Sequence, residues 1–276
     1  TDKQYAAQTG LVGTQLPNHT TPMTLTSSAT SLADGQDTLE LRFESPVLGG
    51  VKLATVYTLR RGAYDMAVRH EVHNQGSAAI TPQLYRQLVR DGSIAGSATP
   101  FYSTFTGPVV YSSTAKYQKV EFADIDKGKA NFEKSTNDGY VAMVQHYFAS
   151  AWLLGDGIQR DNFARKVGDN LYAAGMITPV GTLQPGETKT VQARLDGGAD
   201  ATLVREQRIG RGHAGFHRLA DALAAEGIGG ADRIPDHQHA RGRPARAVQI
   251  AAQWRALAEG LAAPPAATDA PVSAEA

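Results

Sequence analysis

One stretch of the chain decides its fold class: Thr38-Leu39-Glu40-Leu41-Arg42-Phe43-Glu44, in which apolar and polar residues alternate strictly. Successive side chains of a β-strand point to opposite faces, so this stretch predicts a strand with its three apolar residues on one buried face. The same alternation occurs in residues 64–72 and again in residues 190–195. The spacing of apolar residues therefore indicates half-buried β-strands in three separate parts of the chain.

Turn-forming residues separate the predicted strands. They gather at four points, namely Asn74-Gln75-Gly76, Asp91-Gly92, Asn137-Asp138-Gly139 and Gln184-Pro185-Gly186. Val51–Leu59 is apolar on both faces, which is typical of an inner strand of a double-layered sheet. Short strands separated by such turns, with no helical period between them, predict a large antiparallel β-sandwich.

The composition changes sharply near Leu195. All ten Tyr lie at or before Tyr172 and all nine Lys at or before Lys189, whereas residues 196–276 hold nine Arg and 22 Ala. We therefore predict a β-sandwich domain over residues 1–195 and an Ala/Arg/Gly-rich tail over residues 196–276. We expect the tail to be of low order, partly helical and partly disordered, because few large apolar residues are present to pack.

Charge and composition exclude several classes of function. The chain has 276 residues with 27 Lys+Arg against 27 Asp+Glu, so it has no basic excess with which to bind nucleic acid. It contains no Cys, which removes disulfides, thiolate zinc sites and cysteine nucleophiles. It has no apolar run of about 18 residues or more, so we predict no membrane-spanning helix.

The segment His70-Glu71-Val72-His73 comes nearest to a metal-binding motif. Positions three apart on a strand face opposite sides, so we do not expect His70 and His73 to chelate one ion. The helical motif that pairs two histidines needs them four positions apart. We predict one inward and one outward histidine, and neither a metal site nor a cofactor site in the chain.

His146 lies within the apolar run Val141–Phe148 and is a candidate general base, because histidine titrates near neutral pH. No second catalytic group has a spacing that singles it out, so we interpret His146 as hydrogen-bonded within the sandwich. His213 and His217 lie four positions apart in the tail and could chelate a metal ion in a helix, but Gly212 and Gly215 weaken such a helix, so we expect no metal site there. We interpret the basic run Arg241–Arg246 as solvated coil. The residues alone thus predict no catalytic centre.

A longer run of residues carries a family resemblance. Asn137 to Trp152 (NDGYVAMVQHYFASAW) resembles the periplasmic domain of the bacterial YidC membrane-protein insertases. Three further segments resemble the same domain in the same order, namely Tyr5–Gly13, Tyr57–Tyr64 and Lys116–Phe122. Together these segments extend the resemblance over Thr1 to Leu195.

The resemblance implies a large twisted β-sandwich of the supersandwich type, related to sugar mutarotases, on the periplasmic side of the bacterial inner membrane. It implies that the parent protein is a membrane insertase that helps inner-membrane proteins to insert and fold, with or without the Sec translocon. As a member of that family, this portion is expected to be an accessory periplasmic domain, soluble as a fragment, and not an enzyme.

Two kinds of partner follow from the resemblance: accessory subunits of the Sec translocon and nascent membrane proteins. The part of the chain that resembles the translocon-contact region runs from residue 87 to residue 127. We take from it a candidate partner-contact surface of aromatic and basic residues, made of Phe105, Tyr111, Lys116, Tyr117 and Lys119. Strand edges with aromatic rims suit such contacts, although the tyrosines also suit a core.

The chain also departs from the family pattern. We expect the first transmembrane helix and the opening strands of the domain to be missing, and the family's later transmembrane helices to be replaced by the tail after Leu195. We hypothesise that the tail is a frameshifted reading of a GC-rich gene, because Lys, Asn, Tyr and Met, whose codons are AT-rich or unique, disappear there. The other reading frames of the coding DNA test this.

Two other classes of function remain open. The first is a carbohydrate-binding or mutarotase-like sandwich protein, which needs a histidine acid and a carboxylate base facing one sugar carbon. His70 or His146, with Glu71 or Glu121, would have to serve as that pair. The second is a periplasmic chaperone or scaffold module that binds unfolded segments independently of membrane insertion.

Overall fold

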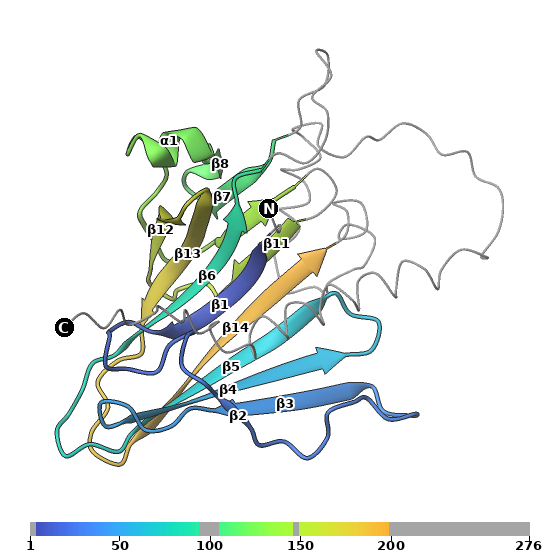
Figure 1. Ribbon diagram of the computed structural model, residues 1–276, viewed down its shortest axis with the longest axis vertical. Helices are drawn as coiled ribbons and strands as arrows, with labels where there is room; N and C mark the ends of the chain where they lie inside the picture. The colour runs from blue at the N-terminus through green and yellow to red at the C-terminus, as the bar shows by residue number, and fades with distance from the viewer. Residues whose placement is uncertain (1–3, 94–104, 146–148, 199–276) are drawn as a thin grey trace, which may run out of the picture.

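Two antiparallel sheets form the described part of the chain, which comprises residues 4–93, 105–145 and 149–198 of a computed structural model (Figure 1). The larger sheet has the order β2-β3-β4-β5-β14-β11-β10-β7-β8, and the smaller has the order β1-β6-β13-β12-β9. The strands of the larger sheet, in that order, are Thr24–Leu25, Thr38–Glu44, Val51–Arg60, Asp65–Asn74, Thr188–Gly198, Ala149–Leu153, Tyr140–Val144, Gly107–Ser112 and Lys116–Lys119. Those of the smaller sheet are Tyr5–Leu11, Gln83–Asp91, Leu171–Pro179, Arg160–Gly168 and Ser135–Thr136.

The all-β sandwich predicted from the sequence is confirmed. All strand pairings in both sheets are antiparallel. Within the described residues the sole helix is α1, Phe122–Asp126, at the end of the molecule where β8 also lies (Figure 1). Apart from α1, the described part of the chain therefore consists of strands and their connections.

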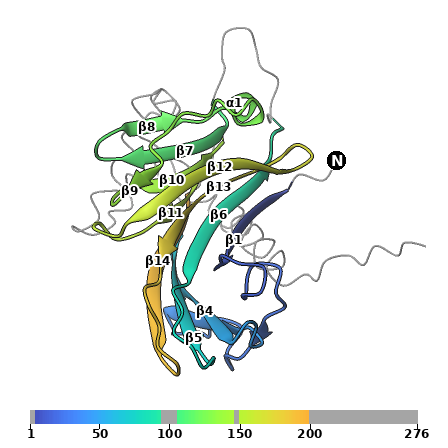
Figure 2. The ribbon, with the colours of Figure 1, turned by 90° about the vertical axis from the view of Figure 1, so that its left-hand side faces the viewer.

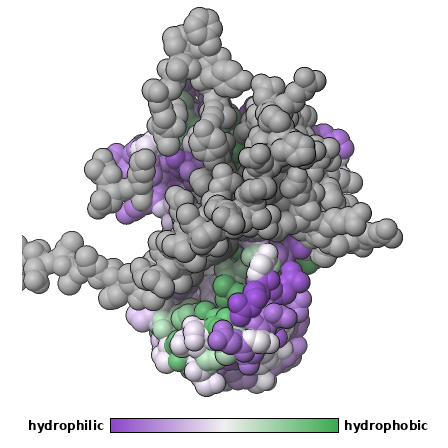
Figure 3. Space-filling view, turned by 90° about the vertical axis from the view of Figure 1, so that its right-hand side faces the viewer, coloured by the Kyte–Doolittle hydropathy of each residue, from purple (hydrophilic) through white to green (hydrophobic). Residues whose placement is uncertain are grey.

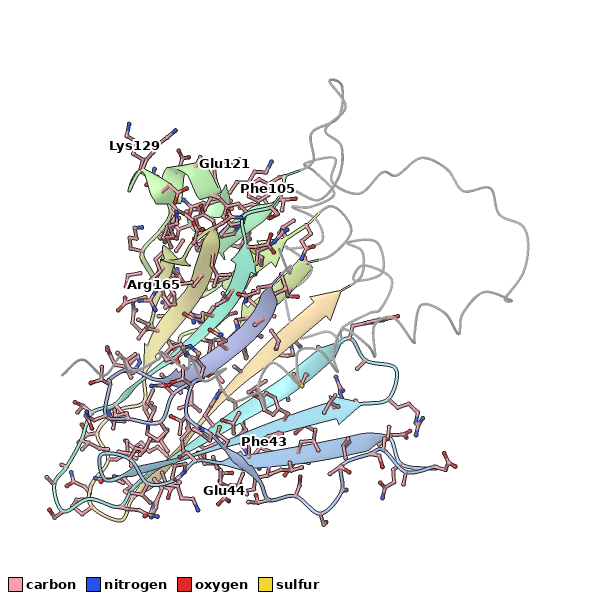
Figure 4. The ribbon with its side chains drawn as sticks, in the orientation of Figure 1. Phe43, Glu44, Phe105, Glu121, Lys129 and Arg165 are labelled. Atoms are coloured by element: carbon pink, nitrogen blue, oxygen red, sulfur yellow. The ribbon has the colours of Figure 1, made fainter. Side chains whose placement is uncertain are left out.

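The alternation in β3 separates a core face from a charged face. The ring of Phe43 packs edge-on against Tyr57 of β4, with centroids 5.9 Å apart, beside the main core. The next residue, Glu44, lies on the opposite face, where its carboxylate pairs with Lys52 Nζ at 2.6 Å (Figure 4). One strand thus supplies both a core residue and an outer ion pair, as its residue pattern predicts.

Strands β4 and β5 also follow their sequence patterns. Met66, Val68, His70 and Val72 of β5 are buried, whereas the residues between them are half-buried or exposed. β4 pairs with β3 on one side and β5 on the other, which confirms that Val51–Leu59 forms an inner strand.

The main hydrophobic core lies between the two sheets. Trp152 of the larger sheet is 1% exposed, and its indole Nε1 donates a hydrogen bond to the carbonyl of Gln87 in the smaller sheet, at 3.1 Å. Leu88 and Met176 contribute to this core from the smaller sheet, and Val141 from the larger. A second cluster, which includes Leu11, Leu53, Val72, Leu84 and Leu183, also joins strands of both sheets. Burial of this apolar surface is the main force that holds the sheets together.

Strand β14 connects the two halves of the larger sheet. It pairs with β5 along Thr188–Asp196 and with β11 along Arg194–Gly198. Figure 2 shows the larger sheet turning strongly along β14, from β4 and β5 at one end to β10, β7 and β8 at the other. The twist wraps the upper strands around the smaller sheet. The domain boundary at Leu195 stays a prediction, and β14 itself continues to Gly198.

The surface at the lower end of the molecule is mixed. Hydrophilic side chains gather on one side there, with hydrophobic side chains beside them (Figure 3). Arg42 belongs to a chain of ion pairs on the outer face of β3 to β5, with Glu44 at 2.7 Å and Glu71 at 2.8 Å. These side chains are half-buried, so the outer face of these strands is charged and still reached by water.

The predicted low-order tail, residues 196–276, lies outside the described residues from position 199 onward, as do His146, His213, His217 and the basic run Arg241–Arg246. The helical and disordered character of the tail and the frameshift hypothesis therefore stay predictions. Among the described residues, no helix has the length and apolar character needed to cross a membrane.

Candidate partner-contact site

The β7–β8 hairpin forms one edge of the larger sheet and carries four of the five predicted contact residues. β7 pairs with β10 on its inner side and with β8 on its outer side, which makes β8 the edge strand. β8 is only four residues long and has a lysine at each end, Lys116 and Lys119. A short edge strand flanked by lysines resists unspecific strand pairing.

A row of three tyrosines supports the hairpin. Tyr140 of β10, Tyr111 of β7 and Tyr117 of β8 lie directly opposite one another on neighbouring strands. The rings of Tyr111 and Tyr140 stack with centroids 5.0 Å apart and 7° between their planes. Tyr111 is 6% exposed and Tyr140 is 1% exposed, whereas Tyr117 is half-buried. Tyr111 is therefore a supporting residue, and the surface itself begins at Tyr117.

This tyrosine row lies on the opposite side of the sheet from the main core. Val141 and Met143 of β10 pack into the main core, whereas Tyr140 and Ala142 belong to a separate cluster with Tyr111 and neighbouring apolar residues. Burial raises the pKa of Tyr140, and the nearby Tyr117 and Tyr111 raise it further. The Tyr140 phenol is therefore neutral at physiological pH and serves packing rather than proton transfer.

Phe105 and Lys119 meet beside the edge strand. The Lys119 ammonium lies 5.5 Å from the centre of the Phe105 ring, which is a cation–π distance. Gly107 allows this approach, because a Cβ atom there would lie 3.0 Å from the Phe105 ring. Figure 4 shows Phe105 at the same end of the molecule as Glu121 and α1. The fold thus brings the ring of Phe105 and the cation of Lys119 together, although a full hairpin separates them in the sequence.

The turn between β7 and β8 fixes Lys116 in a left-handed conformation, with φ of 60°. Its Nζ donates a hydrogen bond to the Ser113 carbonyl at 2.5 Å. Ser112 Oγ accepts a hydrogen bond from the Ala115 backbone N–H at 2.9 Å and also contacts the Glu133 carboxylate. These bonds hold the turn, so the two lysines occupy defined positions at either end of β8.

Sequence reasoning missed the residues that hold this hairpin in place. Glu133 contacts Ser112, and Gln118 accepts a hydrogen bond from the Glu133 backbone N–H at 3.0 Å. The Asp138 carboxylate accepts a hydrogen bond from the Ser113 backbone N–H at 3.1 Å. These contacts join separate segments, so no local spacing reveals them. The only available signal was the turn chemistry of Asn137-Asp138-Gly139.

The mutarotase-type pair is not assembled by the described residues. His70 is 0% exposed between the sheets, and its Nε2 lies 2.9 Å from Thr9 Oγ1. Glu71 points to the opposite face, where it pairs with Arg42. Glu121 lies at the start of α1. His70 therefore shares no cleft with Glu71.

The two histidines of the metal-like motif lie on opposite faces, as predicted. His70 is buried, whereas His73 Nδ1 lies 2.8 Å from Thr188 Oγ1 on the outer face. Burial, and then the nearby Arg86 cation, hold the pKa of His70 well below its usual value, so the ring is neutral. Over the described ranges, no three His, Asp or Glu side chains are arranged to hold a metal ion.

The fold defines an all-β sandwich module, and one edge of its larger sheet carries aromatic and basic side chains. A family model described as the YidC periplasmic domain matches residues 1–211. The chain belongs to this family. The match continues beyond Leu195, so the resemblance extends further along the chain than the sequence segments indicated.

Similar proteins carry the same family name. A membrane protein insertase YidC from Burkholderia cenocepacia is 48% identical over 204 residues, which is 73% of this chain and 37% of that protein. A membrane protein insertase YidC from Aromatoleum aromaticum is 47% identical over 195 residues, 70% of this chain and 36% of that protein. The chain therefore spans little more than a third of the length of these relatives.

Solved structures show only distant likeness. A putative aldose 1-epimerase from Escherichia coli K12 aligns with a TM-score of 0.37 and 13% identity, over 64% of this chain and 68% of that one. The α-galactosidase AgaB from Geobacillus stearothermophilus aligns with a TM-score of 0.38 and 10% identity, over 72% of this chain and 32% of that one. Values this low carry no information about activity.

Proposed function

We propose that the chain is the periplasmic portion of a membrane-protein insertase and acts by binding partner proteins rather than by chemistry. The observation that carries this proposal is the family match over residues 1–211, supported by relatives named as insertases at 48% identity. In this proposal the domain lies on the periplasmic side of the bacterial inner membrane. Residues 1–195, with the end of β14 to Gly198, form the folded domain, and the rest of the predicted tail is a separate segment.

The proposed docking surface is the β8 edge with Phe105. It offers two exposed lysines, Lys116 and Lys119, a half-buried Tyr117 and an aromatic ring at Phe105. Aromatic residues at a basic rim are typical of protein–protein contact surfaces. We infer that the partners are accessory subunits of the Sec translocon, with nascent membrane proteins as substrates of the parent insertase. The buried Tyr111 supports this surface from behind.

Site-specific photo-crosslinking tests the docking surface. A benzoyl-phenylalanine residue replaces Lys119 in one variant of the full chain and Arg60 in a control. The Arg60 side chain is 63% exposed, at the end of β4. Both variants are exported to the periplasm of cells with an intact Sec translocon. We expect adducts with a translocon accessory subunit, identified by antibody, at position 119 and none at position 60.

Two results of the crosslinking contradict the proposal. Equal adducts at both positions show unspecific proximity, and adducts only with unfolded client chains support the chaperone alternative instead.

The mutarotase-like alternative has less support, because His70 and Glu71 lie on opposite faces of β5. A sugar-epimerisation assay of the full chain is expected to show no rate above background.

A further inference from the structure

A groove of about 340 Å³ lies on the outer face of the smaller sheet, away from the docking surface. Its floor comes from alternate residues of three neighbouring strands: Tyr85 and Gln87 of β6, Ile177 of β13, and Phe163 and Arg165 of β12. The residues between them, such as Leu88 and Met176, face the main core instead. The groove is therefore separate from the sandwich interior.

Two glycines give the groove its shape. Gly175 of β13 lies between Gln87 and Phe163 in register, so no side chain rises from the floor at that point. Gly10 of β1 lets the loop of residues 12–20 lie close to the sheet, because a Cβ atom there would be 2.5 Å from Asn18 Cα. This loop forms one wall of the groove.

Tyr85 ties the loop wall to the floor. Its hydroxyl oxygen accepts a hydrogen bond from the His19 backbone N–H at 3.1 Å and also contacts His19 Nδ1. The two rings meet edge to face with centroids 5.8 Å apart. Burial, and then the Arg165 cation, lower the pKa of His19, so this imidazole is neutral at neutral pH. His19 thus adds a neutral aromatic ring to the wall of the groove.

Arg165 gives the groove an uncompensated positive charge. Its guanidinium lies 5.0 Å from the centre of the Phe163 ring, which holds it at the groove. Among the described residues, no carboxylate forms an ion pair with it, whereas the neighbouring Lys166 pairs with Asp126 at 3.2 Å. A guanidinium supported by an aromatic ring is a geometry suited to binding carboxylates.

Gln87, which lines the groove, has a buried side-chain acceptor without a hydrogen-bond partner. Its side chain is only 3% exposed, and its Nε2 donates a hydrogen bond to Gln8 Oε1 at 2.7 Å. Its own Oε1 has no hydrogen-bond partner. A buried acceptor without a donor costs roughly 1–3 kcal/mol, so an N–H group supplied by a ligand would stabilise this site.

We propose that this groove binds a short acidic peptide segment. One carboxylate of the peptide pairs with Arg165, an apolar side chain packs among Tyr85, Phe163 and Ile177, and a peptide N–H donates to Gln87 Oε1. The volume suits two or three residues. The source of the peptide rests on the proposed function. Segments translocated across the inner membrane carry few Lys and Arg, so they lack internal partners for their carboxylates.

A titration followed by ¹H–¹⁵N NMR on the full chain tests this site. The probe is an acetylated and amidated tripeptide of glutamate, phenylalanine and glutamate, and the neutral control has glutamine at both acidic positions. We expect shifts at the backbone amides of Gln87, Phe163 and Gly175, with binding at least tenfold weaker for the neutral peptide. Arg165→Gln should weaken binding by about tenfold, because it removes a charge-assisted hydrogen bond. Arg165→Lys should fall between the two.

The matched control is Lys129→Gln, which removes one exposed positive charge at the far side of α1, distant from Arg165 in Figure 4. It should leave the affinity within twofold. Equal binding of both peptides, or an equal effect of Arg165→Gln and Lys129→Gln, overturns the proposal. Glutarate binding as tightly as the peptide overturns it as well, because the site would then select a small carboxylate. If position 119 crosslinks to a translocon subunit and the NMR titration shows no peptide binding at the groove, the groove inference alone fails and the proposed function stands.

Discussion

Gly139 and Gly157 have nearly the same backbone conformation, with φ of 87° and 83°, but different surroundings. A Cβ atom at Gly139 would lie 1.8 Å from the Tyr111 carbonyl oxygen, whereas one at Gly157 would meet nothing within 4 Å. Gly139→Ala therefore combines a conformational cost with a steric clash against β7. We expect it to lower the free energy of unfolding by about 3 kcal/mol, and Gly157→Ala by only about 1 kcal/mol.

Urea unfolding of the two glycine variants measures this difference. Equal losses for the two variants would contradict the account, because they would show that Gly139 is needed only for its φ angle and that β10 does not lie as close to β7 as described.

His70 makes the stability of the fold depend on pH. Its pKa is lowered by burial in the folded chain, whereas the unfolded chain has the ordinary value of about 6.5. Above pH 6.5 neither state binds a proton there. As the pH falls below 6.5 the unfolded state takes up a proton and the folded state does not, so folding stability falls by up to about 1.4 kcal/mol per pH unit.

His70→Leu should remove this contribution. At pH 7 the variant is less stable by about 1 kcal/mol, because the hydrogen bond to Thr9 is lost. Between pH 7 and pH 5 its stability should fall less steeply than that of the unchanged chain, so the two curves approach each other. A gap that stays constant or widens on acidification, or NMR signals of a protonated His70 at pH 5, would show that this histidine is not excluded from water.

At the scale of single residues, the sequence predicted which face of a strand a side chain lies on better than it predicted which side chains touch. The opposite faces of His70 and His73, and of Phe43 and Glu44, follow from strand periodicity alone. The stack of Tyr111 on Tyr140 does not, because it depends on the register between strands that are separated in the chain. For the same reason Tyr111 was predicted as a contact residue, and the structure places it behind the surface.

At the scale of elements, one buried arginine holds two loops together. Arg160 of β12 is 1% exposed and donates hydrogen bonds to four backbone carbonyls, with distances from 2.7 to 3.1 Å. The four carbonyls belong to Asn137, Gly139, Gly155 and Ile158. The pKa of Arg160 is lowered because burial removes part of its charge from water. The carbonyls replace that water and fix the loops before β10 and before β12.

Arg160→Met keeps most of the apolar stem and removes all four donors. We expect the free energy of unfolding to fall by about 3 kcal/mol or more, because a buried side chain and the four hydrogen bonds that tie the two loops to it are lost together. Arg60→Met is the matched control, since Arg60 makes one exposed ion pair with Asp65 at 3.3 Å, and its loss should cost at most about 0.5 kcal/mol. Similar unfolding midpoints for the two variants would contradict this role of Arg160.

The elements themselves were largely accessible from the sequence, but the groove was not. Alternating residues predicted β3, β5 and the end of β14, and apolar residues on both faces predicted β4 as an inner strand. The groove needs Gln87 and Phe163 to lie on either side of Gly175, and no local pattern aligns β6, β13 and β12. The sequence also does not show that the loop of residues 12–20 lies against the sheet. That position depends on the close approach at Gly10.

For the whole molecule, the central question is whether the two halves of the larger sheet, joined by β14, and the smaller sheet form one folded unit. Strand β14 pairs with β5, which lies more than a hundred residues earlier in the chain, and its other edge pairs with β11. Such long-range pairing makes the sandwich cooperative, since the lower and upper strands share one sheet. The docking surface lies on the upper half of the larger sheet, and the groove lies on the smaller sheet that packs against it.

Hydrogen–deuterium exchange of the full chain, read by mass spectrometry, tests this claim most directly. The account predicts slow exchange together in the inner strands β4, β5, β14, β6 and β13, and faster exchange in the edge strands β2, β8 and β9. Slow exchange in β4 and β5 with fast exchange in β14, or fast exchange throughout residues 5–198, would show that the sheets do not form the single sandwich on which the proposals rest.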